Sequence, residues 1–310
     1  MRKIQTIVLF LLCLLWLSAC SNDTTGELSE STTPTVSIVT GWQQENGQTV
    51  YIHEDGSKAI GWLELDGSHY YFDDKGHMQR GWLELSGSTY YLNTDGVAVT
   101  GEAVIDGMTH HFTADGQKVL LVNPWHAVPG DYQPDLITLD SSISSKDIQV
   151  DRSCYDALNA MIAECNRQCP TVCVVSGYRT YDYQSGLYNR KVNYYLENGY
   201  SKAAAKIEAA KVVAVPGTSE HQLGLAVDII DTRSWSLTEV QETLPAQKWL
   251  MENSWRYGFT LRYPKGTTEV TGIIYEPWHY RYVGEALAKE LYESDLTLEE
   301  YLQKHTKMQP

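Results

Sequence analysis

Two short segments in the C-terminal half contain side chains that can bind a metal ion or move a proton. The first contains His221 and Asp228, which are seven residues apart. On one extended strand they would lie about 23 Å apart, too far to share a ligand. We therefore expect a hairpin centred on Gly224 and Leu225, which places residue 221 opposite residue 228, because glycine is favoured at the first position of a two-residue turn. An imidazole and a carboxylate would then face one point.

The second segment is the run Glu276-Pro277-Trp278-His279. Proline is excluded from a helix interior and favoured at the second position of a β-turn, whose ends approach within about 7 Å, so Glu276 and His279 should converge. Two histidines and one carboxylate make a catalytic zinc site with a position open for water, and an unligated glutamate nearby supplies the base. Taken singly, these residues also fit a solvated loop, a salt bridge or a packed strand. Their combination carries the hypothesis.

The elements that must position these residues follow Val119, where helical and strand patterns alternate after a proline-rich loop at residues 123–135. Helices are expected at residues 151–168, 181–197, 201–211, 243–257 and 284–293. Strands are expected at residues 171–176, 225–230, 259–263 and 278–283. This alternation predicts a single α+β domain over residues 119–308.

Residues 39–118 contain a repeat with a period of 20 residues. Each of the first three units begins with Gly-Trp and continues with a glycine, the pair Val50-Tyr51 or Tyr-Tyr, and another glycine, which predicts two strands joined by a turn. Because one hairpin cannot bury its own face, neighbouring units should stack into a short β-hairpin solenoid. A fourth unit has Glu102 in place of the tryptophan, and His110 and His111 in place of the tyrosines. We interpret this unit as a terminal cap.

Residues 1–20 have the features of an export signal. Arg2 and Lys3 precede an apolar run at residues 7–17, shorter than the ~20 residues that cross a bilayer. The run ends in Leu-Ser-Ala-Cys, which resembles the lipobox of bacterial lipoproteins. We therefore expect a lipoprotein signal peptide, with Cys20 as the lipidated first residue of the mature chain and a linker at residues 21–38. The alternative is an ordinary signal peptide cleaved near Ala19, and both place the protein outside the membrane.

Four further cysteines occur at residues 154, 165, 169 and 173, in a compartment that permits disulfides. A helix over residues 151–168 would separate Cys154 and Cys165 by about 16 Å along its axis, too far for a bridge. Any disulfide should therefore come from Cys165, Cys169 and Cys173. Free buried thiols are the alternative.

The composition excludes one class of partner. The chain has 24 lysines and arginines against 39 acidic residues, a formal net charge of −15 at pH 7. Such a charge repels phosphate backbones, so we expect no nucleic-acid partner. Tyrosines and tryptophans number 21 and 9, against 4 phenylalanines. This bias toward rings with a polar group suits the binding of sugars or cations at a surface.

The repeat pattern of Gly-Trp, glycine, Tyr-Tyr-Phe and Asp-Gly closely resembles the choline-binding and glucan-binding repeats of Gram-positive surface proteins. The resemblance implies that, as in the choline-binding members, rings of consecutive units form a cage for a quaternary ammonium group. The matching positions are Trp42, Trp62, Trp82, Tyr71 and Tyr91. The ligand would be choline-bearing teichoic acid or a wall glycan. The alternative is that the rings only hold adjacent hairpins together.

A second resemblance covers residues 119–308 and rests on several motifs in one order. These are Ser-Gly-Tyr-Arg-Thr at 176–180 with Gln184, Pro-Gly-Thr-Ser-Glu-His at 216–221 through Asp228, and the runs at 257–259, 262–264 and 276–284. Together they closely resemble the zinc D-alanyl-D-alanine carboxypeptidases of the vancomycin-resistance type, which are LAS peptidases. The resemblance implies a hedgehog-like, DD-peptidase-like α+β fold around an antiparallel sheet.

The same resemblance implies a role for each matched residue. The Zn²⁺ ligands would be His221, Asp228 and His279, with Glu276 as general base. Arg179 would stabilise an anion, either the oxyanion or the terminal carboxylate of the peptide. Ser219 and Gln184 would be hydrogen-bonding neighbours, unless they serve only as a turn residue and a helix-face residue.

These roles imply an enzyme that removes the terminal D-alanine from peptidoglycan stem peptides. The lipobox at Cys20 implies a lipid anchor at the extracellular face of the plasma membrane, and the repeats imply attachment to the cell wall. Two alternatives stay open at this point. One is an L,D-carboxypeptidase that trims tetrapeptide stems, or a related endopeptidase. The other is a nonenzymatic cell-wall-binding lipoprotein, which would explain the repeats and the lipid but not the five residues of the zinc site.

Overall fold

The computed structural model describes residues 39–85, 88–130 and 132–305. The expected signal peptide with Cys20 and the linker at residues 21–38 lie outside the described residues. Within the described ranges, no helix is both long enough and apolar enough to span a bilayer.

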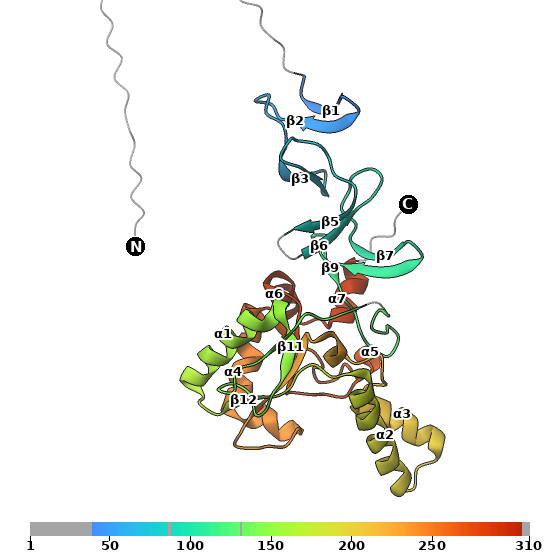
Figure 1. Cartoon of the computed structure of the whole chain (residues 1–310), viewed down its shortest axis with the longest axis vertical. Helices are drawn as coiled ribbons and strands as arrows, with labels where there is room; N and C mark the ends of the chain where they lie inside the picture. Colours follow the sequence, from blue (N-terminus) through green and yellow to red (C-terminus); the bar gives the residue numbers. More distant parts are fainter. Residues whose placement is uncertain (1–38, 86–87, 131, 306–310) are drawn as a thin grey trace, which may run out of the picture. The chain divides into compact units, whose positions relative to one another are not determined.

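The repeats fold as antiparallel hairpins, as their pattern predicts (Figure 1). The pairs are β1 (Gly41–Glu45) with β2 (Gln48–Ile52), β3 (Gly61–Leu65) with β4 (Ser68–Phe72), β5 (Gly81–Leu85) with β6 (Ser88–Leu92), and β7 (Gly101–Ile105) with β8 (Met108–Phe112). At the first turn Asn46 and Gly47 both have positive φ, 51° and 81°, which matches the right-handed twist of the flanking strands.

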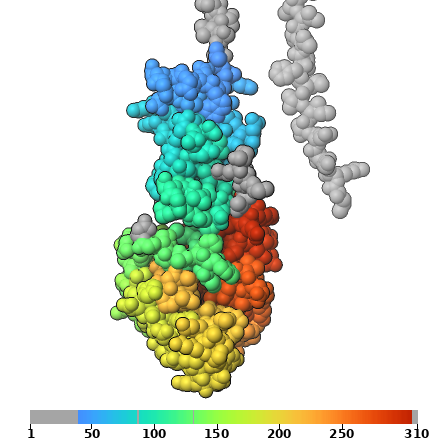
Figure 2. All heavy atoms as spheres, turned by 90° about the vertical axis from the view of Figure 1, so that its right-hand side faces the viewer, coloured from blue at the N-terminus to red at the C-terminus, as the bar shows by residue number. Residues whose placement is uncertain are grey.

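Neighbouring hairpins stack through backbone and side-chain contacts. The Met78 amide donates to the Thr49 carbonyl at 2.8 Å, and the Ala98 amide donates to the His69 carbonyl at 2.8 Å. Phe72 is fully buried and belongs to one apolar cluster with Met78 and Tyr51. Figure 2 shows the units following one another in chain order, from blue to green. The expected stacking of one unit on the next is therefore present.

The fourth hairpin continues into β9 (Lys118–Val119), which adds a third strand beside β8. It contacts the last helix of the chain, α7 (Leu298–His305), where the Ala114 amide donates to the Tyr301 hydroxyl at 3.4 Å. Val119 packs in one apolar cluster with Leu298. The unit interpreted as a cap is thus joined to the C-terminal part of the chain.

The C-terminal part combines helices with an antiparallel sheet, so its α+β class is as predicted. The sheet has the order β12 (Val172–Ser176), β13 (Ala226–Asp231), β15 (His279–Tyr282), β14 (Phe259–Leu261), and a separate pair joins β10 (Leu136–Thr138) to β11 (Gln149–Asp151). Helix α1 (Arg152–Gln168) begins where the Asp151 side chain accepts from the Ser153 amide. Its apolar face, with Leu158 and Ile162, packs in the main core with Val227 of the sheet.

The remaining helices lie close to the expected ranges. They are α2 (Tyr181–Glu197), α3 (Lys202–Val212), α4 (Pro245–Asn253), the short α5 (Thr268–Thr271) and α6 (Glu285–Ser294). Helices α2 and α3 form a helical hairpin beside the sheet (Figure 1). The helix expected at 243–257 is divided into α4 and a 3₁₀ turn, Ser254–Tyr257, and Gly258 with φ 77° ends it. Another 3₁₀ turn covers Glu239–Thr243.

The predicted hairpin at Gly224 and Leu225 is wrong. Residues Glu220–Leu223 form a 3₁₀ turn, and Gly224, with φ 74°, ends it before β13 begins. A side chain at position 224 would place its Cβ 2.9 Å from the Asp151 amide nitrogen, so this close approach requires glycine. The Gly224 carbonyl accepts from the same amide at 2.9 Å. The glycine therefore docks a turn against β11 instead of joining two paired strands.

The cysteines at residues 154, 165, 169 and 173 carry free thiols. Cys154 and Cys165 are fully buried in the main core. Burial raises the pKa of each of these two thiols to about 12. Among the described cysteines, the alternative of free thiols is therefore the correct one, and the disulfide considered for the trio is not formed.

Candidate active site

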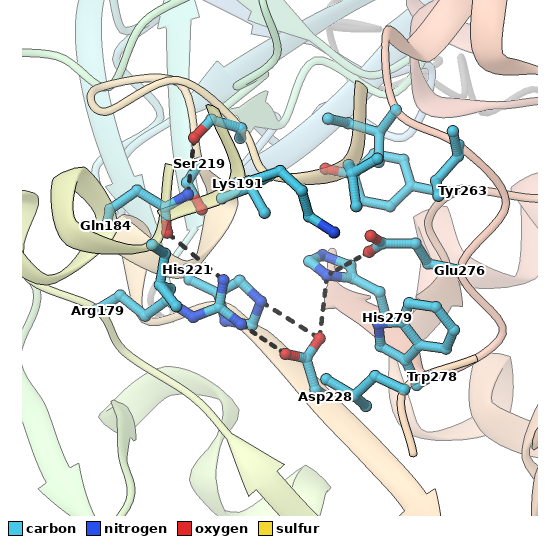
Figure 3. A pocket seen from close by; sticks show the side chains of 17 residues that line it. Arg179, Gln184, Lys191, Ser219, His221, Asp228, Tyr263, Glu276, Trp278 and His279 are labelled. Carbon is cyan, nitrogen blue, oxygen red and sulfur yellow. Dashed lines mark hydrogen bonds and ion pairs between the residues drawn. The ribbon is translucent and has the colours of Figure 1, made fainter. Parts of the chain in front are cut away.

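The side chains of His221, Asp228 and His279 meet at one end of the central sheet (Figure 3). Asp228 on β13 is paired directly with His279 on β15. His221 comes from the 3₁₀ turn before β13, and its Nδ1 donates to the Gly177 carbonyl at 2.8 Å. Gly177 fits there because any Cβ would lie 2.4 Å from the Gln149 carbonyl oxygen. The bond to Gly177 leaves Nε2 of His221 with its lone pair directed at the centre of the site.

The distances in this cluster fit a divalent metal ion. Asp228 Oδ1 lies 3.3 Å from His221 Nε2 and 3.3 Å from His279 Nδ1. Ligands bound tetrahedrally at about 2.0–2.1 Å are separated by about 3.3 Å, so the spacing is that of one metal's ligands. Asp228 Oδ1 is also buried without a hydrogen-bond partner in the described part of the chain. A buried oxygen of this kind needs a cation to replace the water it has lost.

The electrostatics of the cluster keep the carboxylate ionised. Burial by itself would raise the pKa of Asp228, but His221 and Arg179 outweigh it and hold that pKa well below its ordinary value. Burial, and the positive charge of Arg179, lower the pKa of His221 to about 4. These protonation states of His221 and Asp228 are the ones that bind a metal. Burial by itself would lower the pKa of His279, but Asp228 and Glu220 outweigh it and raise that pKa to about 9, so a metal that binds His279 displaces its proton.

Glu276 lies beside this cluster, as the proline turn predicts. The His279 amide donates to the Glu276 carbonyl at 3.2 Å, which closes a β-turn with Pro277 at its second position. The Glu276 Oε2 atom lies 3.6 Å from His279 Nδ1. Burial raises the pKa of Glu276 to about 8. A carboxyl group whose pKa lies near neutral pH can both accept and return a proton.

Arg179 contacts Oδ2 of Asp228, whereas the two histidines lie near Oδ1. It donates from Nη2 to Asp228 Oδ2 at 2.6 Å and from Nε to Ser176 Oγ at 3.1 Å. Its Nη1 donates to Gln184 Oε1 at 3.4 Å, and Gln184 donates in turn to the Ala214 carbonyl at 2.7 Å. Gln184 is fully buried, so it supports the guanidinium instead of covering an exposed helix face.

One cavity contains all seven residues that the sequence suggested for this site, including Ser219. Its wall also includes residues that the sequence reasoning missed, chiefly Lys191, Tyr263 and Trp278, with apolar side chains around them. Lys191 extends across the cavity toward Glu276 (Figure 3). It follows Gln184 by seven residues, two turns of α2, so helical periodicity could have placed both on one face.

A buried charged network behind His279 was also missed. Glu220 Oε2 lies 3.5 Å from His279 Nε2, and its Oε1 accepts from Arg262 Nε and Arg281 Nη1, each at 2.8 Å. Arg262 also pairs with Glu299 on α7 at 2.6 Å. A carboxylate at the outer nitrogen of a metal-binding histidine fixes the orientation and tautomer of the ring. No spacing signal links these residues, because they come from four separate segments.

The aromatic residues of the repeats form two similar groups. Trp42 lies 5.3 Å from Tyr51 and 4.9 Å from Tyr70, measured between ring centroids. Trp62 lies 5.2 Å from Tyr71 and 4.9 Å from Tyr90. Each group joins a Trp-Tyr pair of one hairpin to a tyrosine of the next. The sequence reasoning named Tyr71 but missed the tyrosines at 51, 70 and 90, although the 20-residue period relates them.

The third group differs. Trp82 lies 4.9 Å from Tyr91, but His110 occupies the position of the next tyrosine, 5.0 Å away. The Lys118 ammonium lies 4.9 Å from the centroid of the Trp82 ring. A cation at that distance is attracted by the ring's quadrupole. The Trp82 ring thus has a cation of the chain itself beside it, although its exposed fraction of 42% is similar to the 40% of Trp62.

Comparison with known proteins identifies the family. The D-alanyl-D-alanine carboxypeptidase family VanY matches residues 147–285, and the choline-binding repeat matches residues 59–99. A VanY D,D-pentapeptidase from a VanB-type vancomycin-resistance cassette, solved in complex with Zn(II), is 42% identical, with a TM-score of 0.53 over 59% of this chain and 97% of that chain. The chain belongs to the VanY family of D-alanyl-D-alanine carboxypeptidases. The resemblance drawn from the motifs is confirmed.

Two other known carboxypeptidases are also similar to the chain. A D-alanyl-D-alanine carboxypeptidase of Enterococcus faecalis is 44% identical over 185 residues, which make up 59% of this chain and 65% of that protein. The chain thus spans just under two thirds of the length of this relative. The structure of the LD-carboxypeptidase LdcB is 37% identical, covers 61% of this chain and 86% of that chain, and has a TM-score of 0.53.

Proposed function

We propose that this protein is a zinc-dependent D-alanyl-D-alanine carboxypeptidase with a hedgehog-like fold, which removes the terminal D-alanine from peptidoglycan stem peptides. The observation that carries the proposal is the convergence of His221, Asp228 and His279 around an unpartnered, buried carboxylate oxygen in the described chain, with Glu276 beside them. Zn²⁺ held by these three ligands would supply Lewis acidity toward the scissile carbonyl and toward the attacking water.

Glu276 is assigned as the group that moves the proton. Its carboxyl lies within the cavity and next to the ligand cluster, but it is not one of the three atoms that converge on the metal position. It would accept a proton from water and return it to the amine of the departing alanine. Its burial keeps bulk water from competing for that proton.

Arg179 and Lys191 are the cations available to the substrate's terminal carboxylate or to the oxyanion. The guanidinium group donates two hydrogen bonds to Ser176 and one each to Gln184 and Asp228, so Arg179 is fixed in one orientation. Such a fixed fork is suited to stabilise charge without reorganising. Lys191 is half-buried on α2 and has a flexible stem. It extends over the cavity, where it would meet the carboxylate of a bound peptide.

Peptide cleavage tests the assignment. A pentapeptide stem ending in D-Ala-D-Ala should lose one alanine, observed by mass spectrometry, and amidation of its C-terminus should slow the loss strongly. Arg179→Lys should not restore full activity, because a point charge replaces a planar fork. Equal cleavage of free and amidated peptides would indicate an endopeptidase. Release of alanine from tetrapeptide stems alone would support the L,D-carboxypeptidase, which the similarity to LdcB favours as the second candidate.

We also propose that the repeats bind choline-bearing polymers of the wall. The groups around Trp42 and Trp62 support this, because in each group two tyrosines surround a tryptophan that is about 40% exposed. Choline should therefore quench tryptophan fluorescence, and the protein should bind choline-substituted columns. A folded protein that shows neither response would leave hairpin stacking or glycan binding as the role of the rings.

A lipid anchor at Cys20 on the extracellular face of the membrane completes the proposal. It is supported by the charged, apolar and small-residue pattern of residues 1–20. Cys20→Ala should move the protein from the membrane fraction to the medium, detected by immunoblot. An unchanged distribution would favour either an ordinary signal peptide or retention by the repeats alone. Washing with free choline distinguishes these two, because choline should release a protein that only the repeats retain.

A further inference from the structure

The fourth hairpin replaces an aromatic pair with two potential metal ligands. In the second and third hairpins, the directly opposed residues are Trp62 with Tyr71 and Trp82 with Tyr91. At the same register of β7 and β8, Glu102 faces His111. The His111 side chain is buried, and its Nε2 atom lies 3.4 Å from Glu102 Oε2.

A third ligand comes from the segment that leads into the carboxypeptidase domain. The imidazole of His126 packs edge-on against that of His111, with ring centroids 5.1 Å apart and planes at 82°. One ligand atom from each of Glu102, His111 and His126 lies within 4.8 Å of the other two. These three residues line one pocket, together with Asn123 and Glu299.

The hydrogen bonds of His126 leave one ring nitrogen for a metal. The amides of Trp125 and His126 both donate to the Asn123 side chain at 3.0 Å, so the atom they reach must be the oxygen, Oδ1. His126 Nδ1 lies 2.9 Å from the same oxygen and must therefore carry the proton. Nε2 is then the nitrogen with a lone pair. A hydrogen bond of this kind orients a metal-binding histidine.

We propose that Glu102, His111 and His126 form a second site for a divalent transition ion, for which Zn²⁺ is the natural probe. The 3.4 Å between His111 Nε2 and Glu102 Oε2 already equals the separation of two tetrahedral ligands bound at about 2.0–2.1 Å. The third ligand needs a side-chain adjustment on the order of 1 Å. Two imidazoles and a carboxylate suit zinc better than magnesium or calcium, which prefer oxygen ligands.

The site would join the fourth hairpin to the catalytic part. Asn123, which orients His126, donates from Nδ2 to Glu299 Oε1 on α7 at 3.0 Å. An ion held by β7, β8 and His126 therefore connects the end of the repeats to a segment anchored on α7. A metal bound only by the folded state stabilises that state. This connection is the role that the geometry assigns to the ion.

Metal stoichiometry tests the site in the full chain. After loading with Zn²⁺ and removal of excess metal, elemental analysis should find two zinc ions in the parent and one in His126→Gln. His221→Ala should also hold one, and the double variant none. His69→Gln is the matched control. His69 is paired with Glu64 across β3 and β4, and its Nε2 atom lies 3.7 Å from Glu64 Oε2. Within the described chain this pair belongs to no group of three metal-binding side chains. His69→Gln should keep two.

A spectroscopic readout covers the case in which His221→Ala does not fold. Co²⁺ in place of zinc should give visible d–d absorption from two tetrahedral sites in the parent, and His126→Gln should lose about half of it. Zn²⁺ should also raise the melting temperature of folded His221→Ala, but not that of His221→Ala/His126→Gln. A single zinc that disappears with His221 would overturn the second site and leave the catalytic one. A second zinc that persists in His126→Gln would show that it is held elsewhere, which also overturns the proposal.

Discussion

Glu220 is expected to be essential to the stability of the domain, although it is not assigned a step in catalysis. Its side chain is fully buried and pairs through Oε1 with Arg262 and Arg281, each at 2.8 Å. In Glu220→Gln, Arg262 would keep Glu299, its second carboxylate. Arg281, whose side chain is 2% exposed, would lose the carboxylate with which it pairs in the described chain.

The magnitude follows from leaving a buried charge without its partner. Breaking a buried ion pair from one side costs about 3–5 kcal/mol of the free energy of unfolding. Glutamine still offers one acceptor oxygen, so we expect the lower end, about 3 kcal/mol. With a urea dependence of about 1–3 kcal/mol per molar, the midpoint should fall by on the order of 1 M.

Urea unfolding with a chelator present, followed by circular dichroism, isolates this effect from metal binding. Glu293→Gln is the control. Glu293 Oε1 lies 3.8 Å from Lys289 Nζ on the surface, so this substitution should change the free energy of unfolding by less than about 0.5 kcal/mol. Adding Arg281→Met to Glu220→Gln should cost less than the sum of the single changes, because it removes the unpaired charge. If Glu220→Gln is no less stable than the control, the reasoning is wrong.

The pH dependence provides a further check with a definite sign. Burial by itself would raise the pKa of Glu220, but Arg262 and Arg281 outweigh it and hold that pKa well below the ordinary 4.5. A carboxylate with a lowered folded-state pKa stabilises the fold fully above its ordinary pKa, and that stabilisation is lost as the pH falls toward the folded-state value. The difference between parent and Glu220→Gln should therefore be full at neutral pH and shrink in acid. A difference that grows on acidification would refute the assignment.

Three other outcomes are expected. Glu276→Ala should retain as much zinc as the parent, by elemental analysis, but lose at least about 10²-fold in turnover. His221→Ala should lose the zinc of the catalytic site together with turnover. Near-normal turnover of Glu276→Ala would exclude a proton-transfer role. Lys118→Ala should remove the cation that lies beside the Trp82 ring and add one choline per chain in calorimetric titration. Unchanged stoichiometry would mean that the third aromatic group does not bind choline. Cys154, whose pKa burial raises to about 12, should resist alkylation at mildly alkaline pH until urea is added, and rapid labelling of the folded chain would contradict its burial.

Local chemistry in the sequence was sufficient to predict several parts of the molecule. The turn at Pro277 was predictable because proline restricts its own backbone, and it brings Glu276 next to His279 without help from the rest of the fold. The hairpins of the repeats were predictable because each turn and each alternation of side chains lies within one 20-residue unit. Cys165 was correctly placed on a helix by its spacing from Leu158 and Ile162.

The convergence of His221 and Asp228 was predicted with the wrong local structure. Glycine at position 224 is compatible with a hairpin turn and with the end of a 3₁₀ turn, since both use a positive φ. The choice depends on Asp151, more than seventy residues earlier in the chain, whose amide bonds to the Gly224 carbonyl. Such a contact has no signature in the local sequence.

Only the tertiary structure determined which charged residues are buried and which face the cavity. Glu220, Arg262 and Arg281 look like ordinary surface charges in the sequence, yet the fold places them together behind His279 and removes water from all three. Likewise, Glu102 and His111 were interpreted as marks of a cap, and their proximity to His126 depends on the path of the chain after β9. Sequence spacing predicts neighbours along one element, whereas the charge and desolvation of a site depend on segments that only folding brings together.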